Sequence, residues 1–146
     1  MGTARVGLSA ASGRKVSVIL TVPYARPPML ANDQRRSHYR TVAAAKREVT
    51  EMVGWAAKSA HLGPCGPSAV TITWFVPDKR RRDPDSLAPF AKAALDGLVH
   101  AGVWPDDNSE WVRRLILEIR HDRANPRIEI RIDEIRSATT AEGSSP

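Results

Sequence analysis

The alternation of apolar and charged residues near the end of the chain constrains the fold most. Within residues 127–136, Ile128, Ile130 and Ile132 occupy every second position, and charged residues stand between them. Side chains of a strand alternate between its two faces, so this pattern predicts a strand with one apolar and one charged face. Such a strand belongs to a sheet that covers a core on one side and leaves the other side open to solvent or a partner.

Three more strands and two helices are predicted from similar patterns. Residues 15–22, 69–76 and 111–120 alternate as strands do, and residues 39–60 repeat apolar residues at the three-and-four spacing of a helix. A second helix is expected over residues 87–101, capped by Ser86 or Asp85 and stopped by Gly102. The order β-α-β-α-β-β predicts an α/β or α+β fold with one mixed sheet, helices on one face, and a hairpin of the last two strands.

The 146 residues are most simply read as one domain. Residues 15–136 hold the predicted elements. Residues 1–14 are small and polar and predict a flexible arm, and residues 137–146 have no apolar anchors and predict a disordered tail.

The chain is basic, with a net charge of +6 at pH 7. A small basic domain favours polyanions, which means nucleic acid or, less often, an anionic membrane surface. The alternative is a soluble protein with a cationic surface. Cys65 is the single cysteine, which excludes an intrachain disulfide and fits a reducing cytoplasm. We expect a cytoplasmic protein, because no run approaches the ~20 apolar residues of a membrane span.

Cations and carboxylates meet in the segment that follows the strand over residues 69–76. Asp83 and Asp85 flank Pro84, and the four residues before them are Lys79, Arg80, Arg81 and Arg82. Cations that attract phosphate thus stand beside carboxylates that repel it, and a divalent metal between carboxylate and phosphate would resolve the conflict. The alternative for the D-P-D sequence is a helix cap with favourable dipole placement. Arg35 and Arg36 lie in a second basic segment, which suits either phosphate contact or a solvated connection.

A further acidic pair, Asp106 and Asp107, follows the second predicted helix. A helix of ~15 residues is roughly 22 Å long, so Asp107 reaches Asp83 only if the chain doubles back after Gly102. Carboxylate oxygens suit Mg²⁺ or Mn²⁺. Lys92 would supply a cation for charge that develops on a phosphate. Read alone, an Asp-Asp pair is also a common turn.

Together, RRRDPDSL, AKAALDGL and AGVWPDD resemble the motif series of the RusA-type Holliday-junction resolvases, the crossover junction endodeoxyribonucleases. The resemblance covers residues 78–107 and extends weakly to the element order. It implies a Mg²⁺-dependent, homodimeric endonuclease that cuts symmetrically across four-way DNA junctions, in a bacterial or phage-infected cytoplasm. It also suggests a phage or prophage origin.

The resemblance assigns residues in this region. It places the catalytic, metal-ligating carboxylates on Asp83, Asp85 and Asp107, and the catalytic lysine on Lys92. This sequence has Ser86 where the family usually has Asn. Lys92 follows Asp85 by seven residues rather than the family's four, which leaves it on a similar helix face.

Further expectations concern the neighbours of these residues. The predicted DNA-binding residues are Lys79, Arg80, Arg81, Arg82, Arg35 and Arg36. Asp96 is expected to pair with Lys92 or His100 along the helix. Trp104 is expected in the core.

Two other functions stay open from the sequence. One is a non-catalytic DNA- or RNA-binding module with vestigial carboxylates. The other is a structural or regulatory protein whose basic face binds an acidic protein.

Overall fold

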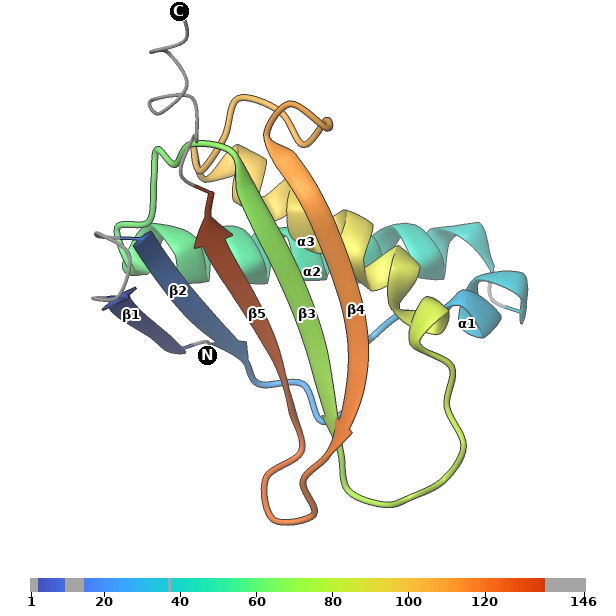
Figure 1. Cartoon of the computed structure of the whole chain (residues 1–146). Helices are drawn as coiled ribbons and strands as arrows, with labels where there is room; N and C mark the ends of the chain where they lie inside the picture. The colour runs from blue at the N-terminus through green and yellow to red at the C-terminus, as the bar shows by residue number, and fades with distance from the viewer. Residues whose placement is uncertain (1–2, 10–14, 37, 136–146) are drawn as a thin grey trace, which may run out of the picture.

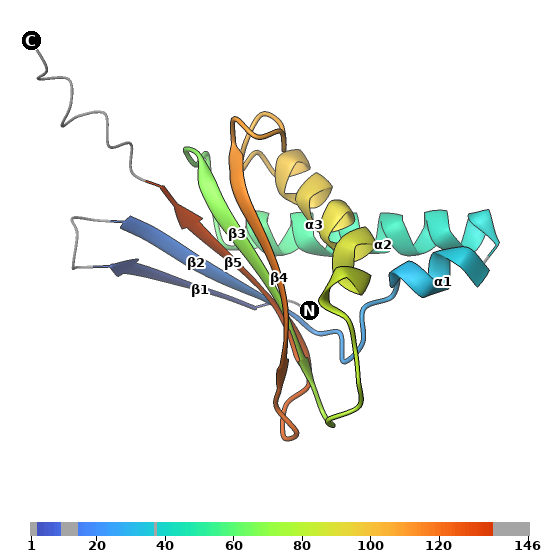
Figure 2. The ribbon, with the colours of Figure 1, turned by 45° about the vertical axis from the view of Figure 1, so that its right-hand side comes forward.

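The computed structural model describes residues 3–9, 15–36 and 38–135, which form a five-stranded mixed sheet with helices on one face (Figure 1). The strands are β1 (Thr3–Ser9), β2 (Lys15–Val22), β3 (Ser68–Val76), β4 (Val112–His121) and β5 (Arg127–Glu134). The helices are α1 (Ala31–Arg36), α2 (Tyr39–Ser59), the 3-10 helix η1 (Pro84–Leu87) and α3 (Ala88–His100). Figure 2 shows α2 and α3 together on one side of the sheet. The predicted fold class is confirmed.

The strands lie in the order β1-β2-β5-β3-β4. β3 and β4 are parallel, and every other neighbouring pair is antiparallel. Parallel neighbours need a long crossover connection, which here contains η1 and α3. The segment with the acidic and basic residues is therefore the crossover itself.

The predicted hairpin of the last two strands is wrong. β5 lies between β2 and β3, and β4 pairs with β3 on the other side. The isoleucines of β5 are at most 1% exposed, whereas Leu115 of β4 is 42% exposed. Burial therefore places β5 in the middle of the sheet and β4 at its edge. Alternation along a strand identifies its apolar face but does not identify the strands beside it.

The prediction of a flexible arm over residues 1–14 needs correction for residues 3–9. These residues form β1, which pairs antiparallel with β2, from Thr3 opposite Thr21 to Ser9 opposite Lys15. The edge of β2 offers unpaired backbone groups that a neighbouring extended segment can satisfy. The predicted tail over residues 137–146 lies outside the described residues.

The core lies between the sheet and two helices that cross at glycines. Buried residues of the inner sheet face, such as Leu20, Ile72 and Ile130, contact the cluster that includes Val53 of α2 and Leu98 of α3. A Cβ added to Gly97 would stand 2.5 Å from the carbonyl oxygen of Thr50 in α2. The crossing therefore brings the backbones of α2 and α3 together and fixes α3, which carries Lys92, on the sheet.

The short helix α1 was not predicted, since the sequence indicated a loop there. Asp33 in its first turn accepts a hydrogen bond from the backbone N–H of Leu30 at 3.0 Å, which stabilises the start of the helix. None of the helices in the described ranges is long and apolar enough to cross a membrane.

Candidate active site

The basic segment between β3 and η1 borders a pocket of about 540 Å³. Its lining comes from the chain around the start of α1, from the inner face of β3, and from the segment that leads into η1. The lining residues are Ala25, Arg26, Leu30, Asn32, Trp74, Pro77, Asp78, Arg80, Arg81, Arg82, Asp83 and Ser86. Four arginines and one predicted catalytic carboxylate thus share one concave surface.

Arg82 is the arginine that the fold holds in place. Its side chain is 16% exposed, its Nη1 donates to Asp78 Oδ1 at 2.9 Å, and its guanidinium lies 5.3 Å from the centre of the Trp74 ring. The hydrogen bond from Arg82 holds the pKa of Asp78 below its usual value. Both contacts orient the cation toward the pocket before any ligand binds.

The other cations of the run stay accessible. The side chain of Arg80 is 80% exposed and makes a long ion pair of 3.4 Å with Asp78. Lys79 and Arg81 are exposed, and neither pairs with a carboxylate among the described residues. Such side chains can turn toward an incoming phosphate at little cost.

Asp83 and Asp85 are exposed, and their carboxylates make no hydrogen bond or ion pair within the described ranges. Asp83 precedes η1 without a side-chain cap, and α3 likewise begins without one. The cap predicted from Ser86 or Asp85 is therefore wrong. The Ser86 hydroxyl instead donates to the backbone carbonyl of Asp83 at 2.6 Å, which bends the chain there. Since neither aspartate is needed as a cap, their carboxylates remain free to bind a ligand.

α3 ends before Gly102, as predicted, and the chain reverses there. Gly102 has a positive φ of 86°, and Val103 N–H donates to the carbonyl of Leu98 at 3.0 Å. Trp104 is 1% exposed and donates from its indole to the carbonyl of Gly66 at 3.1 Å, which confirms its predicted place in the core. The reversal is thereby anchored, and the acidic pair that follows is directed back along α3.

Lys92 and Asp107 meet as a result of this reversal. Lys92 Nζ lies 2.7 Å from Asp107 Oδ2 and 3.1 Å from Asp96 Oδ1, so the predicted pairing of Asp96 is confirmed. The hydrogen bond to Asp107 raises the pKa of Lys92, and the same bond lowers the pKa of Asp107. Both groups are therefore charged at neutral pH.

The donor chemistry of three aspartates suits a hard divalent cation, but the structure does not assemble them into one group. Among the described residues, no three His, Cys, Asp or Glu side chains lie close enough to hold a metal ion together. Asp83 and Asp85 precede α3 and have no partner among the described residues, whereas Asp107 is paired with Lys92. Mg²⁺ is usually bound through one or two carboxylates, several waters and substrate phosphates. The residues fit a cation that is shared with a phosphate.

Two contributors to the pocket were missed from the sequence. Arg26 lines it and pairs with Asp33 at 3.1 Å, and Asp78 orients Arg82. Residues 78–82 are not helical, so no local pattern in the sequence indicates the contact between Asp78 and Arg82. Arg35 and Arg36 lie in α1, and their side chains are outside the described part of the structure.

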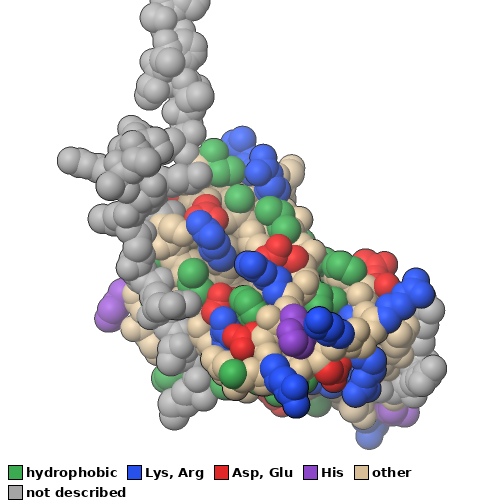
Figure 3. Space-filling model, turned by 60° about the horizontal axis from the view of Figure 1, so that its bottom comes forward, with side chains coloured by type: hydrophobic (Ala, Val, Ile, Leu, Met, Phe, Trp, Pro, Cys, Tyr) green, Lys and Arg blue, Asp and Glu red, His purple; other side chains and the backbone are tan. Residues whose placement is uncertain are grey.

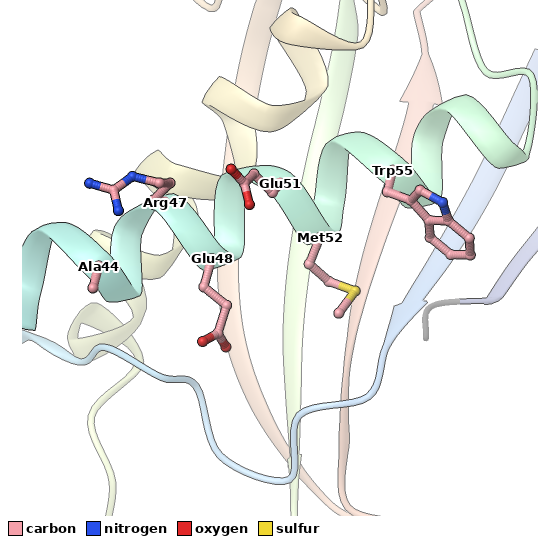
Figure 4. A pocket seen from close by; sticks show the side chains of 6 residues that line it. All are labelled: Ala44, Arg47, Glu48, Glu51, Met52 and Trp55. Carbon is pink, nitrogen blue, oxygen red and sulfur yellow. The ribbon is translucent and has the colours of Figure 1, made fainter.

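Cationic side chains are spread over the face that Figure 3 shows, and acidic side chains lie among them. The basic surface is therefore mixed in charge. A second hollow of about 530 Å³ lies along α2, where the side chains in Figure 4 include Glu51, Met52 and Trp55. Its described lining contains none of the predicted site residues.

Comparison with known proteins agrees with the motif series. The sequence profile of the family described as "Endodeoxyribonuclease RusA" matches residues 21–133. The protein named "Crossover junction endodeoxyribonuclease RusA" from Escherichia coli strain K12 is 37% identical over 91 residues, which cover 60% of this chain and 72% of that protein. The protein of the same name from Shigella sonnei strain Ss046 is 35% identical over 94 residues, which cover 62% of this chain and 72% of that protein. With a match over most of its length and the acidic and basic segments in place, this chain belongs to the RusA family of endodeoxyribonucleases.

Proposed function

We propose that this protein is a Mg²⁺-dependent endodeoxyribonuclease that resolves four-way DNA junctions, or Holliday junctions, by paired phosphodiester hydrolysis. Membership of the RusA family and the names of the relatives support this activity. The observation that carries it is the pair of exposed carboxylates of Asp83 and Asp85, which have no partner in the described part of the chain, and of which Asp83 lines a pocket with four arginines. Carboxylates that stand beside cations able to contact phosphate can share a divalent metal ion with that phosphate.

In this proposal Asp83, Asp85 and Asp107 hold Mg²⁺, and Mn²⁺ can replace it. Such an ion, when bound, polarises a phosphoryl oxygen and lowers the pKa of an attacking water. The chain supplies the ionised donors: the pKa of Asp107 is already lowered by Lys92. Asp83 and Asp85 are free of competing protein partners in the described structure.

The cations bind and orient the DNA backbone. Arg82, held by Asp78 and Trp74, offers a fixed contact for a phosphate at the pocket. The exposed Lys79, Arg80 and Arg81, with Arg35 and Arg36 of α1, add contacts that weaken as salt rises. Lys92 supplies a charged ammonium near Asp107 for negative charge that develops on the reacting phosphate.

Paired incisions need two equivalent sites. A four-way junction has two-fold symmetry, and a C2 homodimer presents one site to each of two opposed strands. We therefore propose a homodimer that acts on branched DNA in the cytoplasm of a bacterial or phage-infected cell.

The test is cleavage of a labelled four-way junction and of a matched linear duplex, with and without Mg²⁺. We expect the junction to be cut only with the metal, and Asp83→Asn and Asp85→Asn each to lower the single-turnover rate by at least about 100-fold. Glu51→Gln removes an exposed carboxylate of α2 and is the matched control, with an unchanged rate expected. Wild-type cleavage by Asp83→Asn would refute the assignment.

The same assay separates the non-catalytic alternative. Tight binding of the junction without cleavage in either Mg²⁺ or Mn²⁺ would identify a DNA-binding module. The paired state of Asp107 and the lack of three grouped ligands among the described residues are the observations that favour this alternative.

A further inference from the structure

Lys92 is shared by two carboxylates in the described structure. Its Nζ lies 2.7 Å from Asp107 Oδ2 and 3.1 Å from Asp96 Oδ1. The proposed function assigns a divalent cation to Asp107 but not to Asp96. An ammonium group and a divalent cation on the same carboxylate would stand close together and repel each other. The ammonium of Lys92 must therefore leave Asp107 when a divalent cation binds there.

The two members of this ion pair differ in how firmly the fold holds them. The side chain of Asp107 is 17% exposed, and its backbone N–H donates to Asp106 Oδ1 at 2.7 Å. The turn that carries Asp107 follows Trp104, which is anchored in the core. The side chain of Lys92 is 57% exposed, and its ammonium ends a flexible four-carbon stem. When the pair opens, the ammonium moves and the carboxylate stays in place.

Asp96 keeps the released ammonium close to the site. It lies four residues after Lys92 on α3, the spacing at which side chains of a helix are neighbours. This contact does not involve Asp107, so it persists when Asp107 takes another partner. An ammonium group has three donors, so one that is bound to Asp96 can still donate to a phosphate oxygen. Lys92 can thus exchange Asp107 for a phosphate without leaving the site.

We propose that Lys92 holds the place of the divalent cation on Asp107 in the free protein and thereby couples cation binding to DNA binding at this site. A DNA phosphate draws the ammonium away from Asp107 and frees the carboxylate. A divalent cation on Asp107 releases the ammonium for the phosphate. This inference rests on the cation site of the proposed function, and it adds that neither ligand binds at full strength alone.

Thermodynamic linkage gives the size of the coupling. Either ligand alone has to break the ion pair of Lys92 with Asp107, whereas both ligands together break it once. Each ligand therefore tightens the binding of the other by one factor, which is the same in both directions. The factor reflects the strength of the ion pair, and a partly exposed pair of this kind corresponds to about fivefold in an equilibrium constant.

Titration with Mn²⁺ in the absence of DNA measures the competition directly. The full chain is titrated, and electron paramagnetic resonance counts the unbound Mn²⁺. We expect Lys92→Gln to bind Mn²⁺ about fivefold more tightly than wild type, because no ammonium competes for Asp107. Equal affinities, or no detectable binding by either chain, would overturn the proposal.

Two controls separate a competitor from a nearby positive charge. Lys58→Gln removes an exposed lysine of α2 and should keep the wild-type affinity for Mn²⁺. In an Asp107→Asn background, Lys92→Gln should change the affinity by less than about twofold, because the contested carboxylate is gone. A gain in Lys58→Gln, or a gain in Lys92→Gln that survives the loss of Asp107, would show a general charge effect and overturn the proposal.

Junction binding measures the coupling from the side of the DNA. Fluorescence anisotropy gives the dissociation constant of a labelled four-way junction with and without Ca²⁺, which binds oxygen ligands with less demanding geometry than Mg²⁺. Denaturing gels identify the intact junction, and only intact junction is counted. We expect Ca²⁺ to tighten junction binding by wild type more than by Lys92→Gln, with a ratio of about fivefold between the two effects. An equal effect of Ca²⁺ on both chains would overturn the coupling.

These results are separable from the proposed nuclease activity, because the Mn²⁺ titration contains no DNA. A chain that cuts the junction, but whose wild type and Lys92→Gln bind Mn²⁺ equally, refutes the coupling and leaves the nuclease assignment intact. A gain in Lys92→Gln that depends on Asp107, in a chain that cuts no junction, supports the competition and refutes the proposed nuclease.

Discussion

Gly97→Ala is expected to destabilise the protein because α2 and α3 cross at glycines. A Cβ at position 97 would stand 2.5 Å from the carbonyl oxygen of Thr50 and 3.1 Å from the backbone nitrogen of Gly54. Both contacts are with backbone atoms, which cannot rotate away, so the helices must move apart. That movement would also stretch the 3.2 Å hydrogen bond from Thr50 Oγ1 to the carbonyl of Ala93.

The expected magnitude follows from two opposing terms. Overpacking costs about 1–3 kcal/mol, and a contact with rigid backbone belongs at the upper end. Alanine in a helix interior returns about 1 kcal/mol relative to glycine. The net loss for Gly97→Ala is therefore about 2 kcal/mol, which lowers the melting temperature of a domain of this size by about 5 °C.

Gly54→Ala is the matched control from the facing helix. A Cβ there would stand 3.2 Å from the carbonyl oxygen of Gly97, a tight contact that small shifts can relieve. The gain in helix propensity offsets this contact, so a change within about 0.5 kcal/mol is expected. Urea unfolding at constant m value measures both variants. Wild-type stability of Gly97→Ala, or a greater loss in Gly54→Ala, would refute the account of this crossing.

Three more predictions concern the site and its support. Arg82→Ala is expected to weaken DNA binding and to reduce the salt slope of log K by about one, as anisotropy over a salt series would show, because one phosphate contact is lost. Asp107→Asn is expected to lower the free energy of unfolding at neutral pH by less than about 1 kcal/mol, since Lys92 is 57% exposed and screened. Folding lowers the pKa of Asp107, so this stabilisation is present above about pH 4 and is lost as the pH falls through the folded pKa, which urea unfolding across pH would follow. Trp104→Phe is expected to lower the free energy of unfolding by about 1–3 kcal/mol in thermal melts, because it leaves buried acceptors without the indole donor.

Controls for these variants come from exposed positions. Arg123→Ala removes an arginine outside the pocket lining and should keep the wild-type salt slope, whereas an unchanged slope in Arg82→Ala contradicts the phosphate contact. Lys92→Gln should match Asp107→Asn in its dependence on pH, and a loss of stability that does not diminish as the pH falls below about 4 contradicts the ion pair. Trp55→Phe changes a tryptophan that is 47% exposed and should leave the melting temperature unchanged. Equal melting of Trp104→Phe and wild type would exclude a structural role for the indole donor.

Most helices and strands were predictable because their signals are local. The strand predicted over residues 15–22 coincides with β2, and the helix predicted over residues 39–60 ends within one residue of α2. Apolar periodicity reports which face of a segment is buried, and Gly102 marked the end of α3 because a positive φ suits glycine. The missed β1 and α1 are short elements whose side chains carry weak patterns.

The motif series assigns Asp83, Asp85, Asp107 and Lys92 to the candidate site, and these assignments stay a prediction. The arrangement of these residues was not predictable. The ion pair of Lys92 with Asp107 was not predicted, nor was the anchoring of Arg82 by Asp78 and Trp74. The distances between these residues depend on how α3, the chain after Gly102 and β3 pack together. No local sequence pattern reports that packing.

Most strands and helices, the face that each buries, and the segment with the carboxylates and cations could be read from local sequence, because each depends on residues within a few positions. The tertiary structure alone decided that β5 enters the sheet between β2 and β3, that β4 is left at the edge, and that Asp107 is held by Lys92. Strand neighbours and ion pairs between distant segments depend on which arrangement buries the most apolar surface at once, and that quantity belongs to the whole chain.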